Sequence, residues 1–477
     1  MEYQLRRLDR ETVLAALREG EYEAIATSSH GAMDELLHLA IALGVFEALK
    51  QIEIQRERAG IPDELLLRLA AVLPFVEGTG LRVAAGELLK DAAILLELGF
   101  SLEQVQNGFN QRTHGGQGKG NAPFHPEVLR DELARIDGGS LQGYRRACID
   151  PLFARKLVKG KVYAIDGSGI HDQYRLVGLL NVHDEQPLWM NWRLLTGNAS
   201  EKGKEAVVVK EMVEEVLAAG GPGCIAWLLM DALYADGPLL AWLAYECGIH
   251  ALVRLPEDRL LYRDLEGLAR TELIDQQTFT DVRYLSGRKQ VRDMSIAAVG
   301  ELRSWPSFAE AAAQYNAPTA TLWAALIHGV DRDTDKTETW ALASTHPFPD
   351  GRSGYQRWRA RWRIENNGFR ELKEGWQLER APWSRTNTTV VAARVAFTLI
   401  AFNVAQLIKT TKGRQLADRG IRRLRRELGN DYGPAPIIVF ARGVFAVFHI
   451  EEIMHLVGLP PQHSLRKPNA TGPPSLS

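Results

Sequence analysis

Two aspartates lie where the chain leaves an apolar, strand-like segment. Asp166 follows the β-rich run KVYAI and precedes Gly-Ser-Gly, whose small residues leave room for a metal ion or a closely approaching backbone. Asp231 directly follows the apolar run WLLM. Burying a lone carboxylate is costly, so an acid in such a place is usually paired or bound to metal at a strand end. The alternative for Asp166 is an aspartate that simply opens a turn.

A third acid, Glu365, lies in an arginine-rich segment that we predict to be helical. The segment from Asp350 to Lys373 holds seven basic and three acidic residues, a net charge of +4. On a helix, Trp358, Arg361 and Glu365 share one face, because offsets of three, four and seven keep side chains aligned. Neighbouring arginines stabilise the ionised carboxylate, which suits a metal ligand beside phosphate. The alternative is a solvated helix held by salt bridges.

Two carboxylates on neighbouring strands and one on a following helix can together hold two divalent cations. Such a pair, about 3.5–4 Å apart, activates water and stabilises the leaving oxygen in phosphodiester hydrolysis. Oxygen-only ligands favour Mg²⁺ or Mn²⁺ over zinc, and the histidines show no HExxH spacing. His171-Asp172 and His183-Asp184 resemble half of a metal-dependent phosphohydrolase set, but we predict them to lie in turns.

The elements that would position these acids alternate in a mixed α/β pattern. Residues 1–110 carry helical periodicity, and from Lys159 the runs GKVYAIDGSGI, RLVGLLNVHD and PLWMNWRLLTG predict an antiparallel meander. A helix at about 204–219, the strand CIAWLLMDALY, the helix LLAWLAYECG and the strand HALVRLP follow. This order predicts a mixed sheet covered by helices.

The rest of the chain is predicted to add an insertion and a helical C-terminal part. Residues 258–350 suit a β-rich insertion, a helical stretch runs from 355 to 376, and PIIVFARGVFAVFHIEEIMHLVG closes the fold as a last helical segment. The apolar run 388–408 is interrupted by Arg394, Asn403 and Gln406. It predicts a buried core helix rather than a membrane span, because a central arginine costs roughly 2.5–3.5 kcal/mol on insertion.

Composition indicates a folded, multi-domain protein but does not identify a binding partner. The 477 residues, 45% hydrophobic and 24% charged, exclude disorder for the bulk of the chain and predict two to four domains. The 57 basic and 59 acidic residues give a net charge of −2, which hides any local patch. Three scattered cysteines favour a reducing compartment, and the glycine-rich run HGGQGKGNAPFHP does not satisfy a phosphate-loop motif.

One segment is strongly basic. Residues 409–426, KTTKGRQLADRGIRRLRR, hold eight basic residues against one acid. Such a stripe would neutralise DNA phosphates and make binding strongly salt dependent. The expected contacts are Arg422, Arg423, Arg425 and Arg426. The alternative is a solvated helix face.

The ordered acids, within AIDGSG, LLMDALY and RWRIENNGFRELK, resemble those of the DDE transposases of bacterial insertion sequences. The similarity is greatest to the cut-and-paste group with a Tyr-x2-Arg-x3-Glu-x6-Lys signature and a β-rich insertion, and it covers roughly residues 159–408. The resemblance implies a ribonuclease H-like fold, with Asp166, Asp231 and Glu365 as catalytic ligands of Mg²⁺ or Mn²⁺, two ions in all. It also implies that Arg361 contacts phosphate near the cleaved end.

The sequence departs from that signature at two positions. Trp358 stands at the Tyr position, where it keeps an aromatic face for stacking on a base but lacks the hydroxyl, and Tyr355 lies three residues too early. Leu372 stands at the Lys position, with Lys373 one residue late. On a regular helix eight residues rotate about 80° away from Glu365, whereas seven rotate only about 20°. Lys373 can therefore serve only if the Glu helix contains a one-residue bulge.

Three tryptophans of the insertion have two possible roles. Trp305, Trp323 and Trp340 could include a wedge for a flipped nucleotide, as similar transposases use, or belong to the core. Core packing is the commoner role of such residues.

The resemblance and the residue patterns together predict an organisation and a function. The expected parts are a helical DNA-binding region (1–112), a linker with connecting helices (113–158), the first part of the catalytic core (159–257), a β-rich insertion (258–345), the second part of the core with the Glu helix (346–408), and a basic C-terminal region and tail (409–477). The fold class is α/β, a ribonuclease H-like mixed sheet with helices on both faces, and with helical N- and C-terminal regions.

The expected function is a transposase that cleaves transposon ends and joins them to target DNA. Its partners would be double-stranded DNA, both transposon end and target, and a second copy in a synaptic homodimer, with no membrane, in the bacterial cytoplasm at the nucleoid. Two alternatives remain open: a nuclease of the same fold without strand transfer, and a catalytically silent DNA-binding protein descended from a transposase.

Overall fold

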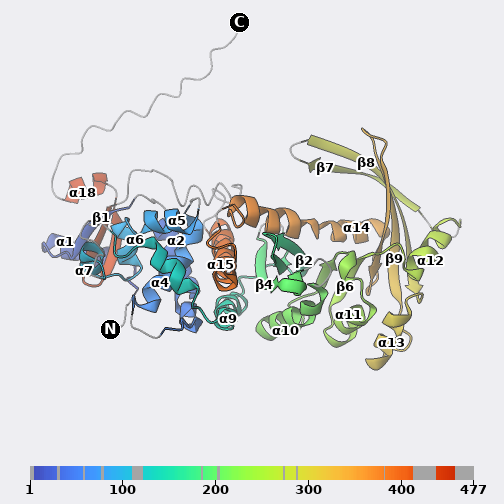
Figure 1. Cartoon of the computed structure of the whole chain (residues 1–477). Helices are drawn as coiled ribbons and strands as arrows, with labels where there is room; N and C mark the ends of the chain where they lie inside the picture. Colours follow the sequence, from blue (N-terminus) through green and yellow to red (C-terminus); the bar gives the residue numbers. More distant parts are fainter. Residues whose placement is uncertain are drawn as a thin grey trace, which may run out of the picture. The chain divides into compact units, whose positions relative to one another are not determined.

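The chain forms two compact units. The computed structural model describes residues 5–28, 33–56, 60–76, 80–109, 122–183, 186–200, 205–271, 274, 276–285, 288–380, 382–411, 437–448 and 450–456. Within these ranges, one unit comprises 1–42, 56–132 and 423–477, and the other comprises 43–55 and 133–422. Figure 1 shows the elements of both, and each unit is described here by itself.

A nine-stranded mixed sheet forms the centre of the larger unit. Its strand order is β4-β3-β2-β5-β6-β10-β9-β8-β7. The first five strands in the chain are β2 (Val162–Ile170), β3 (Tyr174–Asn181), β4 (Leu188–Thr196), β5 (Trp227–Met230) and β6 (His250–Leu255). β2, β3 and β4 pair antiparallel, whereas β5 pairs parallel with both β2 and β6. The predicted meander and mixed sheet are therefore confirmed, and the sheet fits the ribonuclease H-like fold that the resemblance implies.

The predicted β-rich insertion extends this sheet. It consists of β7 (Gln276–Leu285), β8 (Arg288–Leu302), β9 (Leu322–Asp331) and β10 (Thr337–Ser344), with helices α12 (Leu260–Ala269) and α13 (Pro306–Gln314) between strands. β10 pairs antiparallel with β6, with Ser344 opposite Leu252. Because this pairing is continuous with the core, the insertion shares the backbone hydrogen bonds of the sheet that carries the acids.

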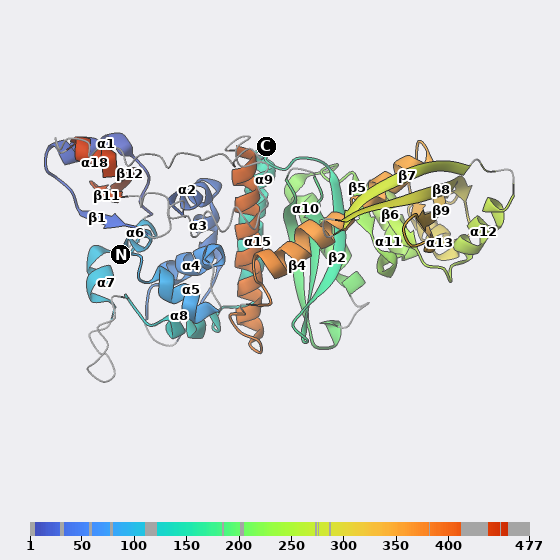
Figure 2. The same cartoon turned by 90° about the horizontal axis from the view of Figure 1, so that it is seen from above.

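Helices cover both faces of the sheet. α14 (Gly351–Arg359) and the π-helical segments η7 (Ile364–Phe369) and η8 (Glu371–Gly375) lie along one face, with α10 (Val209–Gly220) and α11 (Gly237–Ala241) on the other (Figure 1). α15 (Thr388–Thr411) and α9 (Ser140–Ala154) lie side by side near β4, as both views show (Figure 2). The predicted helix near 204–219 is present as α10, preceded by the 3-10 turn η4 (Glu205–Val208).

The apolar helix α15 is part of the core, as its polar residues predict. Among the described residues, Thr388–Thr410 is the stretch long and apolar enough to cross a membrane, but 94% of its most apolar window is buried inside the protein. Asn403 accepts a hydrogen bond from the Trp189 N–H at 2.8 Å and donates one to the Trp189 carbonyl at 2.7 Å. Arg394 donates to the Trp376 carbonyl at 3.1 Å. These bonds offset the cost of burying polar groups within the helix.

The smaller unit packs short helices beside a three-stranded sheet. The strands are β1 (Ala24–Thr27), β11 (Ile437–Ala441) and β12 (Val444–Phe448), in the order β1-β11-β12. The helices include α1 (Arg10–Arg18), α4 (Asp63–Val72), α5 (Leu81–Leu88), α6 (Ala92–Glu97), α7 (Leu102–Asn107) and α18 (Ile450–Leu456). Two more helices, α2 (Met33–Leu43) and α8 (Pro126–Leu133), belong to this unit except for their last residues. The helical periodicity predicted for 1–110 is present, interrupted by β1.

The prediction of a helix over PIIVFARGVFAVFHIEEIMHLVG, and with it an all-helical C-terminal region, was wrong. The segment forms the hairpin β11-β12, and only α18 is helical. Arg442 and Gly443 have φ values of +52° and +74°, the left-handed pair that a two-residue hairpin turn requires. Val439 and Ala446 then pack against Val13 of α1. Apolar content alone favours a helix in this segment, whereas Arg-Gly between two five-residue apolar runs is the better indicator of a hairpin.

Two predicted features lie outside the described residues. The basic segment is described only to residue 411, so Arg422, Arg423, Arg425 and Arg426 are not among the residues with a structure here. Most of the glycine-rich run falls within residues 110–121, which are likewise outside the described ranges. Both remain sequence predictions.

A buried ion network joins α9, β4 and α10. Glu215 accepts hydrogen bonds from Arg145 at 2.6 Å, Arg193 at 2.9 Å and Asn191 at 2.8 Å, and also from Arg146 at 2.6 Å. Burial alone would raise the pKa of Glu215, but these hydrogen bonds and the Arg145 charge outweigh burial and lower it to about 2. The network is therefore strongest when Glu215 is ionised.

Glu215→Gln should lower the stability of the larger unit by about 3 kcal/mol at neutral pH, because it leaves Arg145 buried without its charge partner. A carboxylate with a depressed folded pKa contributes stability above its unfolded pKa and loses it as the pH falls. The wild-type melting temperature should therefore fall between about pH 5 and pH 2 more steeply than that of the variant. Circular dichroism melting curves over this range measure both effects. Glu211→Gln is the matched control, since Glu211 is more exposed and bonds only Arg193 in this network; an equal loss in both variants would contradict the role of burial.

Candidate active site

The parallel pairing of β2 with β5 brings the two aspartates to one edge of the sheet. Ala164 pairs with Leu229, and Asp166 and Asp231 each lie two residues beyond that pair. Because side chains alternate between faces along a strand, equal offsets place both carboxylates on the same face. Asp231 begins the short turn after β5, and Asp166 lies within β2. The two strand-end acids singled out in the sequence are therefore neighbours in space.

The Glu365 helix crosses the same face and is fixed against the sheet by close packing. It begins at Asp350, whose Oδ1 accepts a hydrogen bond from the Ser353 N–H at 2.8 Å. Further along, a Cβ on Gly368 would lie 2.8 Å from the Trp189 ring, so only glycine permits this approach. Phe369 packs on the same ring with centroids 5.2 Å apart. Close contact at Gly368 and Phe369 thus holds Glu365, one turn earlier, over the β2 edge.

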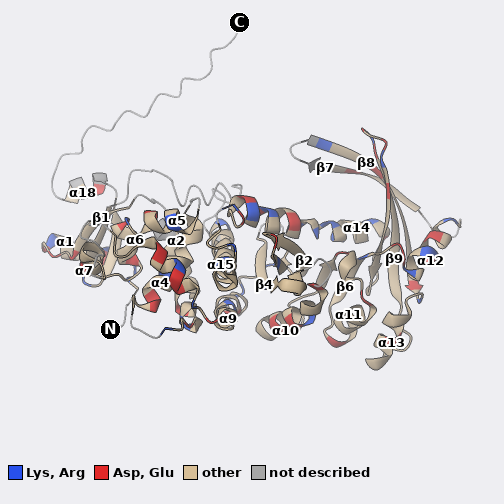
Figure 3. Ribbon diagram, in the orientation of Figure 1, with Lys and Arg blue, Asp and Glu red and all other residues tan. Residues whose placement is uncertain are grey.

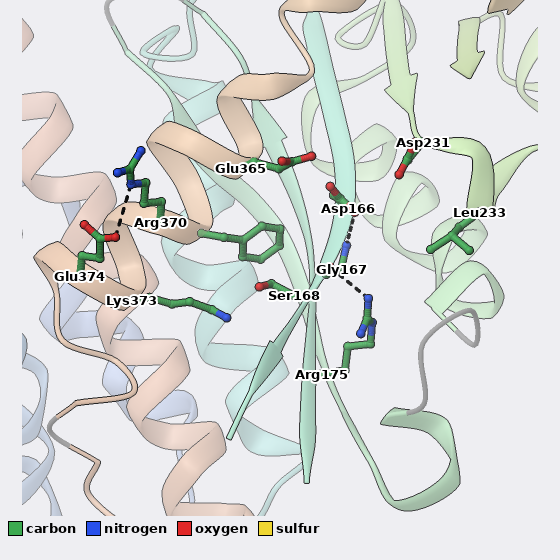
Figure 4. Close-up of a pocket in the computed structure, with 11 residues that line it drawn as sticks. Asp166, Gly167, Ser168, Arg175, Asp231, Leu233, Glu365, Arg370, Lys373 and Glu374 are labelled. Carbon is green, nitrogen blue, oxygen red and sulfur yellow. Dashed lines mark hydrogen bonds and ion pairs between the residues drawn. The ribbon is translucent and has the colours of Figure 1, made fainter. Parts of the chain in front are cut away.

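The three acids line one open pocket of about 410 Å³. Figure 4 shows Glu365 reaching toward Asp166, with Asp231 facing them from the other side. The wall below them carries basic and polar groups from the sheet and the Glu helix. The complete lining is Asp166, Gly167, Ser168, Arg175, Asp231, Leu233, Glu365, Phe369, Arg370, Lys373 and Glu374. One pocket therefore has an acidic part and a basic part.

Arg361 joins two of the acids. Its NH1 is 3.0 Å from Asp166 Oδ2 and its NH2 is 2.8 Å from Glu365 Oε1. Burial raises the pKa of Asp166 to about 6, although the Arg361 guanidinium and the Gly167 N–H oppose the rise. The charges of Glu365 and Asp231 are smaller contributions to this rise. The acids thus repel one another, and the ionised set is favoured by a cation among them.

Lys373 lines the same pocket as Glu365, eight residues away. The helix between them is π-helical in η7 and again in η8. A widened turn such as η7 accommodates one extra residue, so the eight-residue step can return to the face that seven residues would reach on an α-helix. The bulge that Lys373 requires is therefore present. Its Nζ forms an ion pair with Glu379 Oε1 at 2.9 Å.

The two aromatic residues near the Tyr position lie outside the pocket. Trp358 is 4% exposed, and its ring centroid is 4.5 Å from that of Trp340, so stacking on a base would require this contact to open. Tyr355 is fully buried and its hydroxyl donates to Asp281 at 2.7 Å in the insertion. Trp305 and Trp340 are both buried, as core packing predicts.

Other acidic and histidine residues near these strands have structural positions. Asp236 caps α11, accepting a hydrogen bond from the Leu239 N–H at 3.0 Å. His171 lies in the turn between β2 and β3 with φ of +49°, and neither it nor Asp172 lines the pocket. His183 does not line the pocket either, and Asp184 lies outside the described residues.

Sequence reasoning missed a buried ion pair beneath Asp166. Arg175 of β3 lines the pocket, is 2.9 Å from Glu205 Oε1 and donates to the Gly167 carbonyl at 3.2 Å. Glu205 is fully buried. A Cβ on Gly167 would lie 3.0 Å from both Arg175 and Glu205, and this close approach explains why a glycine follows Asp166. The signal in the sequence was Arg175 itself, a charged residue directly before the apolar run LVGLL. Ser168, Leu233, Arg370 and Glu374 were missed as well.

The side chains of the three acids are the type of ligand that a hard divalent cation prefers. The three acids offer only carboxylate oxygens, the ligands that Mg²⁺ and Mn²⁺ prefer. Among the described residues, however, no three or more His, Cys, Asp or Glu side chains are gathered closely enough to hold a metal ion. The acids share a pocket, with Arg361 between two of them, and do not form a preassembled metal cluster.

Comparison with known proteins identifies the class to which this fold and site belong. The model of the transposase DDE domain family matches residues 159–403, which is just over half of the chain and contains all three acids. The chain therefore belongs to the family of DDE transposases. The match does not distinguish the Tyr-Arg-Glu-Lys group within the family. No curated protein matches the chain.

Gly368→Ala should destabilise the larger unit by about 1–3 kcal/mol, because the new methyl group overpacks the buried Trp189 ring. The Glu helix should also shift outward and weaken any activity that needs Glu365. The unfolding midpoint in urea measures the first effect. Asn367→Ala is the control, since Asn367 is exposed on the same segment. Equal stability of the two variants would show that the helix does not depend on this contact.

Proposed function

We propose that this protein is an active transposase that cleaves transposon ends and joins them to target DNA by metal-ion-assisted phosphodiester chemistry. The observation that carries the proposal is the convergence of Asp166, Asp231 and Glu365 in one pocket of a chain that belongs to the DDE transposase family. The three acids come from two strands and a helix, and are far apart in the sequence. A purely structural role would not require three carboxylates to share a pocket at a cost in repulsion.

The three acids would hold the ions, which we propose are two Mg²⁺ or Mn²⁺. Bound there, the metal supplies activation of the attacking oxygen and stabilisation of the leaving oxygen. The chain's own part is to fix the ligands: β2 and β5 set the two aspartates, and the packing of the Glu helix on Trp189 sets Glu365. The apolar walls at Leu233 and Phe369 would limit access of water beside the bound strand.

The basic part of the pocket would receive the DNA backbone. Arg175, Arg370 and Lys373 line it next to the acids, so a phosphodiester placed between them meets opposite charge on one side and metal ligands on the other. Figure 3 marks the further Lys and Arg residues along α14 and the segments that follow it. Lys373 and Arg361 are proposed as contacts to phosphate near the cleaved end, and Trp358 as a contact to a base only if it leaves Trp340.

The remaining proposals concern partners and location. The basic segment 409–426, with Arg422, Arg423, Arg425 and Arg426, would bind DNA outside the pocket. Double-stranded transposon-end and target DNA are the substrates, and a homodimer would hold two ends in one synaptic complex. The enzyme would act in the bacterial cytoplasm at the nucleoid. The organisation into a DNA-binding N-terminal region, a core with an insertion and a basic C-terminal region also belongs to this proposal.

Asp166→Asn, Asp231→Asn and Glu365→Gln should each reduce Mg²⁺-dependent cleavage of end DNA on the order of a thousandfold or more, because each removes an ionised metal ligand. Binding of end DNA in the absence of metal should persist. Gel assays of cleavage and of DNA binding, with the DNA that flanks the gene as substrate, measure both. Asp172→Asn, an exposed turn residue just after β2, is the control. Full cleavage by any of the three variants would remove that residue from the site.

Strand transfer separates a transposase from a nuclease of the same fold. With precut ends bearing a 3′-hydroxyl and a supercoiled target plasmid, the wild-type protein with Mg²⁺ should yield covalently joined products. Joined DNA can be detected on denaturing gels and by sequencing the junctions. Cleavage without any joining would instead establish a nuclease, and neither reaction, with intact DNA binding, would establish a catalytically silent DNA-binding protein.

A further inference from the structure

The guanidinium of Arg361 bridges two acids that come from different elements. One of its terminal nitrogens lies 3.0 Å from Asp166 on β2, and the other lies 2.8 Å from Glu365 on η7. The arginine side chain is only 3% exposed. Each nitrogen therefore serves a different carboxylate, and a single buried cation links the strand to the Glu helix.

Two tryptophans flank the guanidinium. Its central carbon lies 5.4 Å from the Trp358 ring centroid and 4.9 Å from that of Trp362. These cation–π contacts hold a planar cation in one orientation. The Nε of Arg361 is buried without a hydrogen-bond partner among the described residues. The hydrogen bond to Asp166 and the ion pair with Glu365 thus keep Arg361 in this place.

The oxygens that Arg361 contacts belong to the set that would hold a metal ion. An oxygen that is held by the guanidinium at 2.8–3.0 Å, through a hydrogen bond at Asp166 and an ion pair at Glu365, is less available to a divalent cation. The arginine supplies one positive charge among three mutually repelling acids, which is the electrostatic role that a metal ion would otherwise fill.

We propose that Arg361 is the resident counter-ion of the DNA-free site and that it competes with the divalent ion for Asp166 and Glu365. This rests on the proposed function, because it takes those acids as metal ligands. Release by Arg361 would make Asp166 and Glu365 available to hold a divalent ion, and would leave the guanidinium available to an oxyanion, for which its fork geometry is suited. Arg361 is in this sense a positioning residue: it keeps the acid set together without metal and sets how tightly the ion binds.

Mn²⁺ binding to the DNA-free full-length protein tests the proposal without knowledge of the transposon ends. Isothermal titration calorimetry should show that Arg361→Gln binds Mn²⁺ roughly tenfold more tightly than the wild type, within the range of ordinary coupling energies. Arg370→Gln is the matched control: Arg370 lines the same pocket but bonds Glu374 rather than the three acids. Its removal changes the net charge equally and should alter Mn²⁺ affinity far less.

Equal or weaker Mn²⁺ binding by Arg361→Gln, or an equal gain in Arg370→Gln, would overturn the counter-ion role. Arg361→Lys retains the charge, but its single ammonium cannot bridge two carboxylates as the fork does. If the glutamine variant does not fold, the lysine variant decides: a two- to threefold gain in affinity supports competition, and no gain overturns it.

A failure of the proposed function has a different outcome. Asp166→Asn, alone and combined with Arg361→Gln, should abolish the Mn²⁺ binding. If Mn²⁺ binds undiminished to these variants, or does not bind to any variant, the acids are not the metal site and the proposed function fails with the inference. If Asp166→Asn abolishes binding while Arg361→Gln leaves it unchanged, the metal site stands and only the counter-ion role is lost.

Discussion

The parallel pairing of β2 with β5 is the constraint on which the rest of the site depends. It places Asp166 and Asp231 two residues beyond a shared register pair, on one face of one sheet edge. Two carboxylates held there repel each other and lose hydration, as the raised pKa of Asp166 shows. The surrounding structure offsets part of this cost with the Arg361 guanidinium and the Gly167 N–H, which both oppose the rise in the Asp166 pKa.

The Glu helix shows how packing and chemistry are coupled in this protein. Gly368 allows the helix to approach the Trp189 ring, and the π-helical turns on either side of Arg370 change the spacing of the side chains that face the pocket. Glu365 and Lys373 both reach the pocket for this reason. A regular α-helix with the same sequence would direct Lys373 about 80° away from Glu365.

Much of the larger unit was predictable, because its signals are local. Strand periodicity before Asp166 and Asp231, helix caps and arginine spacing each depend on neighbours within a few residues, and the structure confirms the mixed sheet and the core helix α15. The hairpin β11-β12 is not evident from apolar content, which favours a helix there, and its local signal is the Arg442-Gly443 turn. Its pairing with β1, more than four hundred residues earlier, leaves no local trace in the sequence.

The sequence by itself identified the candidate residues and the family. The candidates are three acids in order with an arginine-rich helix around the third, and the comparison then showed the family that they resemble. Only the tertiary structure decided which groups meet. It placed Arg361 between Asp166 and Glu365, and it buried the Trp358 side chain in the core. Residue type and spacing set what a side chain can bind, whereas its actual partner depends on strand register, helix geometry and close packing between segments far apart in the chain.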